Sequence, residues 1–168
     1  MNAEELKDFL DEKVVLYNNK NFIDSDPVQI PHLYSQKEDI EIAGFLAATI
    51  AWGNRKMIIN NSHKLMQIMG NSPYDFVMNH KEIHLEKLTG FVHRTFNSSD
   101  AITFLKALQH IYTNYNGLES VFSSTIENNS TQKSISEFKK IFFKIPHLQR
   151  TQKHISDPLN GSAAKSGN

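Results

Sequence analysis

Two short segments combine aromatic, amide and basic side chains of the kind that contact nucleic acids. The first is Trp52–Arg55 (WGNR), which directly follows the most apolar stretch of the chain, and the second is His93–Arg94. Arginine binds phosphates with a bidentate fork, asparagine hydrogen-bonds base edges, and an aromatic ring stacks on an unpaired base. The residues expected at a nucleic-acid-binding surface are Trp52, Asn54, Arg55, His93 and Arg94. The structural alternative is that Trp52 anchors the core and the arginines bond helix C-termini.

Other chemistry has little support in this chain. There is no cysteine, which excludes disulfides, thiol nucleophiles and thiolate metal sites. His80 and His84 stand four residues apart, a spacing that can chelate a metal on a helix, but Lys81 replaces the glutamate of the zinc-protease motif. The glycines stand singly rather than in a phosphate-binding loop, and no pair of acids stands out. We expect a solvated helix face at these histidines, with no metal and no cofactor.

The net charge of zero hides an asymmetry along the chain. Residues 1–50 carry ten acids and four bases, whereas residues 133–168 carry seven bases and two acids. A basic end can attract a polyanion such as DNA. Opposite charges at the two ends could also let two copies meet head to tail, so a homo-oligomer is an alternative.

The beginning of the chain lacks the apolar segment of a signal peptide. No apolar run approaches the roughly 20 residues that a membrane-spanning helix needs. We therefore expect a cytoplasmic protein that does not enter a membrane.

The central element is an apolar helix that leads to the WGNR turn. Its predicted start is a capping box formed by Ser35 and Glu38, and its apolar residues continue to Trp52 on nearly all sides, which is typical of a buried helix. Asn54 is a good N-cap for the next helix, and Gly70 a good residue to follow that helix.

The remaining pattern is also helical. Pro27 and Pro31 predict an extended connector over residues 22–34, and no alternation of period two indicates a strand. Ser98, Ser99 and Asp100 are expected to cap a later helix. Further helices are predicted over 3–17, 73–79, 101–115, 118–122 and 135–144. We expect an all-α protein: a single helical domain of about seven helices over residues 1–146, followed by a poorly ordered basic tail over 147–168.

Several long strings resemble an uncharacterised conserved bacterial family, carried as a domain of unknown function. The matching strings are DPVQIPH (26–32), EDIEIAGFLAATIAWGNRK (38–56), GFVHRTFN (90–97) and HISDPLNGSAAK (154–165). This resemblance implies no established activity.

The apolar helix, polar turn and second helix are also similar to the start of the helix-hairpin-helix DNA glycosylase domain. In those base excision repair enzymes the turn lies near the lesion, and a residue fills the gap left by an extruded base. The likeness places Trp52–Arg55 on that turn and implies a DNA partner. Leu159–Lys165 (LNGSAAK) partly resembles the Leu-Pro-Gly-x-Gly-x-Lys hairpin of that superfamily. Because the hairpin lysine forms a Schiff base in members with lyase activity, Lys165 is the candidate catalytic residue.

The superfamily also needs an aspartate beyond the hairpin. The chain ends at Asn168, so the resemblance implies an N-terminal portion without the catalytic acid. We therefore expect a nucleic-acid-binding, glycosylase-like protein that has no glycosylase activity as it stands. The alternative is a helical protein-interaction or oligomerisation module without catalysis.

Overall fold

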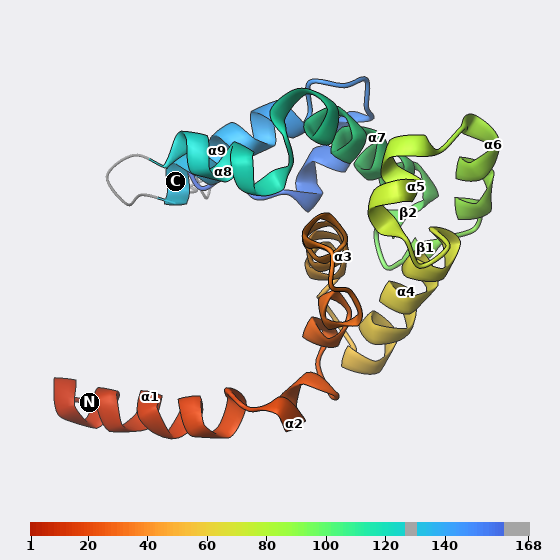
Figure 1. Ribbon diagram of the computed structural model, residues 1–168. Coiled ribbons are helices and arrows are strands. Elements are labelled where there is room, and N and C mark those ends of the chain that lie inside the picture. Colours follow the sequence, from red (N-terminus) through yellow and green to blue (C-terminus); the bar gives the residue numbers. More distant parts are fainter. Residues whose placement is uncertain (127–130, 160–168) are drawn as a thin grey trace, which may run out of the picture.

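The computed structural model describes residues 1–126 and 131–159, which form a helical body and one helix that lies apart from it (Figure 1). These residues contain nine α-helices, four short 3₁₀ helices and one two-stranded hairpin. The all-α class is therefore confirmed. The α-helices outnumber the seven or so predicted because α2 (Lys20–Ile23) and α6 (Glu82–Leu85) are too short to show a periodic apolar pattern.

Helix α3 lies at the centre of the body. The elements that pack around it include α4, α5 and two 3₁₀ helices. The bounds are Lys37–Thr49 for α3, Arg55–Ile68 for α4, Pro73–Asn79 for α5, Pro27–Gln29 for η1 and Pro31–Leu33 for η2. Ile42, Ala43 and Leu46 of α3 are buried, as the apolar pattern predicts.

The second part of the body is built on α7 (Ser98–Tyr115), against which α8 (Leu118–Thr125) and α9 (Thr131–Phe142) pack. An aromatic cluster joins this part to α3. The Phe45 ring of α3 lies 5.8 Å from the Phe104 ring and 5.5 Å from the Phe142 ring. Because each buried aromatic side chain stabilises the fold by roughly 1.5–3 kcal/mol, this cluster fixes α3 against α7 and α9.

Helix α3 differs from its prediction at both ends. Its N-cap is Gln36, and no side chain caps it, so the predicted capping box of Ser35 and Glu38 is wrong. The helix ends at Thr49, before Trp52, and the Trp52 N–H donates to the Ile50 carbonyl at 2.8 Å. The apolar pattern extends past the helix end because Ile50 is fully buried in the core without being helical.

The connector predicted as extended is instead folded into short helices. Pro27 and Pro31 each begin a 3₁₀ helix, where a proline loses no hydrogen bond and its fixed φ suits the first helical position. Ile30 precedes Pro31 and yet has helical angles. Its side chain is fully buried, so core packing outweighs the extended preference of a residue before proline.

The two-stranded hairpin is a further element that the sequence pattern does not predict. It pairs β1 (Val92–His93) with β2 (Phe96–Asn97) through the two-residue turn Arg94–Thr95. Arg94 has a φ of 54°, a left-handed conformation that Asn or Gly usually supplies in such turns. Asn97 then caps α7, accepting from the Asp100 N–H at 3.3 Å, so the helix begins earlier than predicted.

His80 and His84 do not share a helix. Helix α5 ends at Asn79 and α6 begins at Glu82, so the i, i+4 geometry is not formed. Both imidazoles lie instead beside the Phe76 ring, at 5.7 and 6.4 Å between centroids. The described part of the chain holds no group of three side chains placed to bind a metal ion.

The remaining described elements are a long N-terminal helix and two 3₁₀ helices. Their bounds are Ala3–Tyr17 for α1, Glu86–Leu88 for η3 and Gln149–His154 for η4. None of the helices in residues 1–126 and 131–159 combines the length and the apolar character that crossing a bilayer would need.

Candidate functional site

The turn between α3 and α4 brings the WGNR segment to the surface. Gly53 has a φ of +108°, which a residue with a Cβ rarely adopts, and it reverses the chain between the two helices. Asn54 caps α4 as predicted, since its Oδ1 accepts from the Met57 N–H at 3.1 Å. Trp52 is partly buried, whereas Gly53, Asn54 and Arg55 are exposed.

Arg94 reaches this turn from the hairpin. Its guanidinium carbon lies 4.9 Å from the centroid of the Trp52 ring, which is cation–π geometry. A Cβ on Gly53 would lie 3.1 Å from Arg94 Nη1 and 3.2 Å from Arg94 Cδ. Gly53 therefore has two functions: it allows the positive φ, and it leaves room for the arginine to lie over the indole.

His93 fixes the hairpin to the turn from below the surface. Its Nε2 lies 3.2 Å from the Trp52 carbonyl oxygen, and its Nδ1 lies 2.9 Å from Asn61 Nδ2. A carbonyl can only accept, so Nε2 carries the proton and Nδ1 accepts from the Asn61 amide. The imidazole is only 1% exposed, so it braces Trp52 rather than presenting itself to a ligand.

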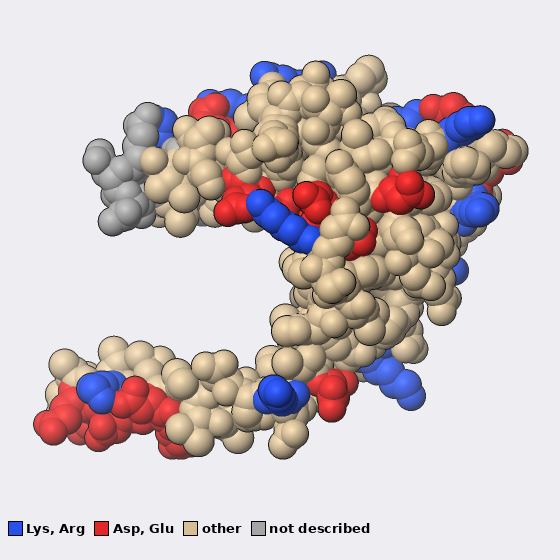
Figure 2. Space-filling view, viewed as in Figure 1, with Lys and Arg blue, Asp and Glu red and all other residues tan. Residues whose placement is uncertain are grey.

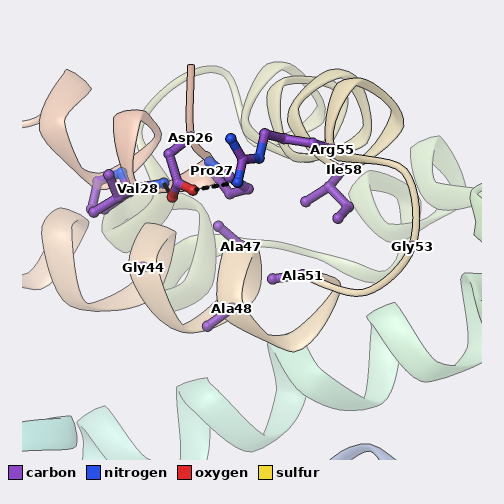
Figure 3. Close-up of a pocket in the computed structure, with 11 residues that line it drawn as sticks. Asp26, Pro27, Val28, Gly44, Ala47, Ala48, Ala51, Gly53, Arg55 and Ile58 are labelled. Carbon is purple, nitrogen blue, oxygen red and sulfur yellow. Dashed lines mark hydrogen bonds and ion pairs between the residues drawn. The ribbon is translucent and has the colours of Figure 1, made fainter. Parts of the chain in front are cut away.

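Arg55 lies beside a pocket of about 500 Å³ (Figure 3). Its guanidinium is 3.9 Å from the Asp26 carboxylate across the mouth, and the small side chains of Ala47 and Ala48 of α3 form part of the wall. The Arg55 side chain is 59% exposed. A pair this long, with a largely exposed arginine, contributes little to stability, so Arg55 can exchange Asp26 for another anion at small cost.

Together these residues form one surface feature. The structure brings Arg94 into contact with Trp52, although the two lie in segments far apart in the sequence. The neighbouring hydrogen bond from His93 to Trp52 joins residues that are 41 positions apart. Arg55 stands at the end of the same turn. We refer to Trp52, Gly53, Arg55 and Arg94 as the Trp52–Arg94 platform.

A second cluster supports the hairpin, and sequence reasoning missed it. Arg150 of η4 donates to the Thr95 carbonyl at 2.9 Å and to Asp100 Oδ2 at 3.0 Å. Thr151 Oγ1 donates to Asp100 Oδ1 at 2.7 Å, and both side chains are fully buried. These bonds fix η4, the hairpin turn and the start of α7 together. The segment 147–159, assigned from sequence to the tail, thus includes groups that hold the platform's hairpin in place.

The protonation of this cluster follows from its burial and its partners. Burial opposes ionisation of Asp100, but hydrogen bonds from Thr151 and the Asn97 N–H, with nearby His154 and Arg150, lower the pKa of its carboxyl below the ordinary value. Burial also lowers the pKa of His154, although Asp100, 3.5 Å from its Nε2, acts in the opposite direction. The favoured state is an aspartate beside a neutral histidine, in which Arg150 supplies the positive charge.

The candidate catalytic residue falls outside this description. Lys165 and the rest of the LNGSAAK string after Leu159 lie outside the described residues. The hairpin likeness at Leu159–Lys165 therefore stays a prediction. The platform, by contrast, is described completely.

Comparison with known proteins gives a family. A family model described as "Protein of unknown function (DUF2400)" matches residues 26–168, a range that includes the WGNR turn, the hairpin and η4. No curated protein and no solved structure matches the chain significantly. The predicted membership of an uncharacterised family is thereby confirmed. The chain belongs to the DUF2400 family of proteins of unknown function.

Proposed function

We propose that this protein binds nucleic acid through the Trp52–Arg94 platform. The observation that carries the proposal is the Arg94 guanidinium 4.9 Å over the Trp52 ring at an exposed turn. A partly exposed aromatic ring under Arg94, with Arg55 at the end of the same turn, supplies both contacts that a nucleic acid strand needs: a surface for a base and charges for phosphates.

The platform is pre-organised for such a ligand. Arg94 is held by its left-handed backbone and by the space over Gly53. Non-glycine residues in this conformation cluster at functional sites, where the surrounding structure maintains the strain. Within the described residues Arg94 makes no ion pair, so its N–H donors are available to a phosphate.

The likeness to DNA glycosylases suggests the form of the nucleic acid. An extruded or unpaired base can stack against the Arg94–Trp52 pair, and Arg55 and Arg94 can bond the flanking phosphates. We therefore propose DNA that contains an unpaired or abasic position as the ligand. The proposal concerns binding and repair-related recognition, and the glycosylase relationship itself remains a prediction from sequence.

Fluorescence anisotropy with labelled oligonucleotides tests this function. We would compare a duplex with an abasic site, an undamaged duplex and a single strand, and titrate each at several salt concentrations. Each arginine that contacts a phosphate adds about 0.9 to the slope of log K against log salt on duplex DNA. Arg94→Ala and Arg55→Ala should each weaken binding about 3- to 10-fold and reduce that slope by about one.

Lys37→Ala is the matched control. Lys37 is an exposed cation at the opposite end of α3 from the turn, about 20 Å away at 1.5 Å per residue. Its removal changes the net charge equally and should leave the affinity nearly unchanged. The proposal is refuted if none of the oligonucleotides binds at low salt, or if Lys37→Ala weakens binding as much as Arg94→Ala.

A further inference from the structure

Helix α1 stands outside the packed body. It has 15 residues and none of them is buried, and Figure 1 shows that it extends away from the rest of the chain. The family match begins at Asp26, after this helix. Isolated helices of this length are marginal in water, so α1 needs a surface that covers one of its sides.

One side of α1 is apolar. Six large side chains, each between 42% and 55% exposed, fall within about 160° of the helix circumference at 3.6 residues per turn. This apolar stripe consists of Leu6, Phe9, Leu10, Val14, Leu16 and Tyr17. Val15, which is 79% exposed, lies on the opposite side.

The charges of α1 limit what can cover the stripe. Acidic side chains run along one side of the helix, and Figure 2 shows them in red, with uncharged atoms facing the body. They are Glu4, Glu5, Asp8, Asp11 and Glu12, against two lysines. An acidic helix is repelled by anionic lipid surfaces and by nucleic acid, so neither of these suits it.

The single cation inside the stripe is already compensated. Lys13 Nζ lies 2.8 Å from the Glu12 carboxylate and 5.0 Å from the centroid of the Phe9 ring. Its aliphatic stem can therefore lie along an apolar partner while its charge stays with Glu12. The apolar side chains of the stripe therefore lie on both sides of a lysine whose charge is paired.

We propose that the apolar stripe of α1 is covered by the same stripe on a second copy of this chain. A stripe on a single helix is self-complementary about a two-fold axis, since each copy offers the surface that the other needs. Half-exposed side chains of this size put roughly 500 Å² of apolar surface on each copy, so pairing buries about 1,000 Å² in total, near the lower limit for a specific dimer. The acidic sides then face away from the contact.

The charge of α1 predicts how the affinity of this dimer changes with salt concentration. Each α1 carries five acids and two lysines, so two copies repel one another. Salt screens that repulsion, since the Debye length falls from about 10 Å at 0.1 M to about 3 Å at 1 M. The dimer therefore tightens as salt is raised, whereas nucleic-acid binding weakens, so the two proposals succeed or fail separately.

Sedimentation velocity over a range of protein and salt concentrations tests the proposal. The expected result is a monomer–dimer equilibrium that Leu10→Asp weakens about 100-fold, because a carboxylate would be buried in the stripe. Val15→Asp adds the same charge to the opposite side of the same helix and should weaken the dimer only slightly. Thermal melts followed by circular dichroism should be the same for both variants, since α1 contributes nothing to the body's core.

Four results would overturn the proposal. These are a monomer at all concentrations, a dimer that Leu10→Asp leaves intact, equal weakening by the two variants, and a dimer that dissociates as salt rises. Co-sedimentation of the wild-type chain with neutral phosphatidylcholine vesicles, lost in Leu10→Asp but not in Val15→Asp, would also overturn it and assign the stripe to a lipid surface.

Discussion

Replacing Gly53 with alanine should destabilise the protein through two separate effects. The backbone at Gly53 has a φ of +108°, and an L-residue held there is strained by about 1–2 kcal/mol. The new Cβ would also lie 3.1 Å from Arg94 Nη1 and 3.2 Å from Arg94 Cδ. Displacing the guanidinium weakens its cation–π interaction with the Trp52 ring, at a cost of about 0.5–1 kcal/mol. We expect Gly53→Ala to lower the free energy of unfolding by about 1.5–3 kcal/mol.

Urea unfolding followed by circular dichroism measures this change. Gly70→Ala is the matched control, because Gly70 also has a positive φ, +68°, but no atom within 4 Å of the position of a Cβ. Its penalty should be backbone strain alone, about 1 kcal/mol. A double-mutant cycle separates the two effects at Gly53, since the clash is absent in an Arg94→Ala background.

The penalty of Gly53→Ala should be smaller by about 0.5–1 kcal/mol when Arg94 is alanine. An equal penalty in both backgrounds would show that Arg94 does not pack over Gly53. A penalty no larger than that of Gly70→Ala would refute the reasoning about both strain and contact at the WGNR turn.

Two further predictions concern the cluster that holds the hairpin. Thr151→Val should lower the free energy of unfolding by about 2 kcal/mol, because the buried Asp100 loses its 2.7 Å hydrogen bond; a change below about 0.5 kcal/mol in urea unfolding would contradict this. The pKa of His154 in the folded protein is lower than its ordinary value of 6.5. As pH falls through 6.5, the unfolded chain therefore binds a proton at His154 that the folded chain does not, so the free energy of unfolding falls. The lowered pKa of Asp100 causes a second loss of stability as pH falls below its ordinary value of 3.8. In urea midpoints measured from pH 8 to pH 3, His154→Gln should flatten only the first of these two losses. An unchanged pH profile in this variant would contradict the assignment to His154.

The features that depend on local sequence were predictable. The all-α class, the Asn54 cap and the stop at Gly70 follow from apolar periodicity and from side chains that act within one helical turn. Residue type alone also singled out the WGNR and His93–Arg94 segments, as a predicted nucleic-acid-binding surface. Their contact could not, because it depends on how α3, α4 and the hairpin pack together.

The features that sequence reasoning missed depend on tertiary packing. Ile30 is helical before a proline because its side chain fills the core. The hairpin turn uses Arg94 and Thr95 in place of the usual Asn-Gly, so no turn signal marks it. Arg150 and Thr151 fall in the segment predicted as a tail, whereas the structure places them against Asp100. Their local signal was no more than an arginine beside a threonine in a polar segment.

The chain itself supplies the probe for the central claim. Trp52 is the only tryptophan, so intrinsic indole fluorescence reports on the platform alone. We predict that titration with an abasic-site duplex at low salt quenches or shifts the Trp52 emission with the same midpoint as the anisotropy of the labelled DNA, and that Arg94→Ala moves both midpoints together. DNA binding seen by anisotropy without any change in Trp52 emission would contradict the account, because it would show that the nucleic acid is bound elsewhere on the protein.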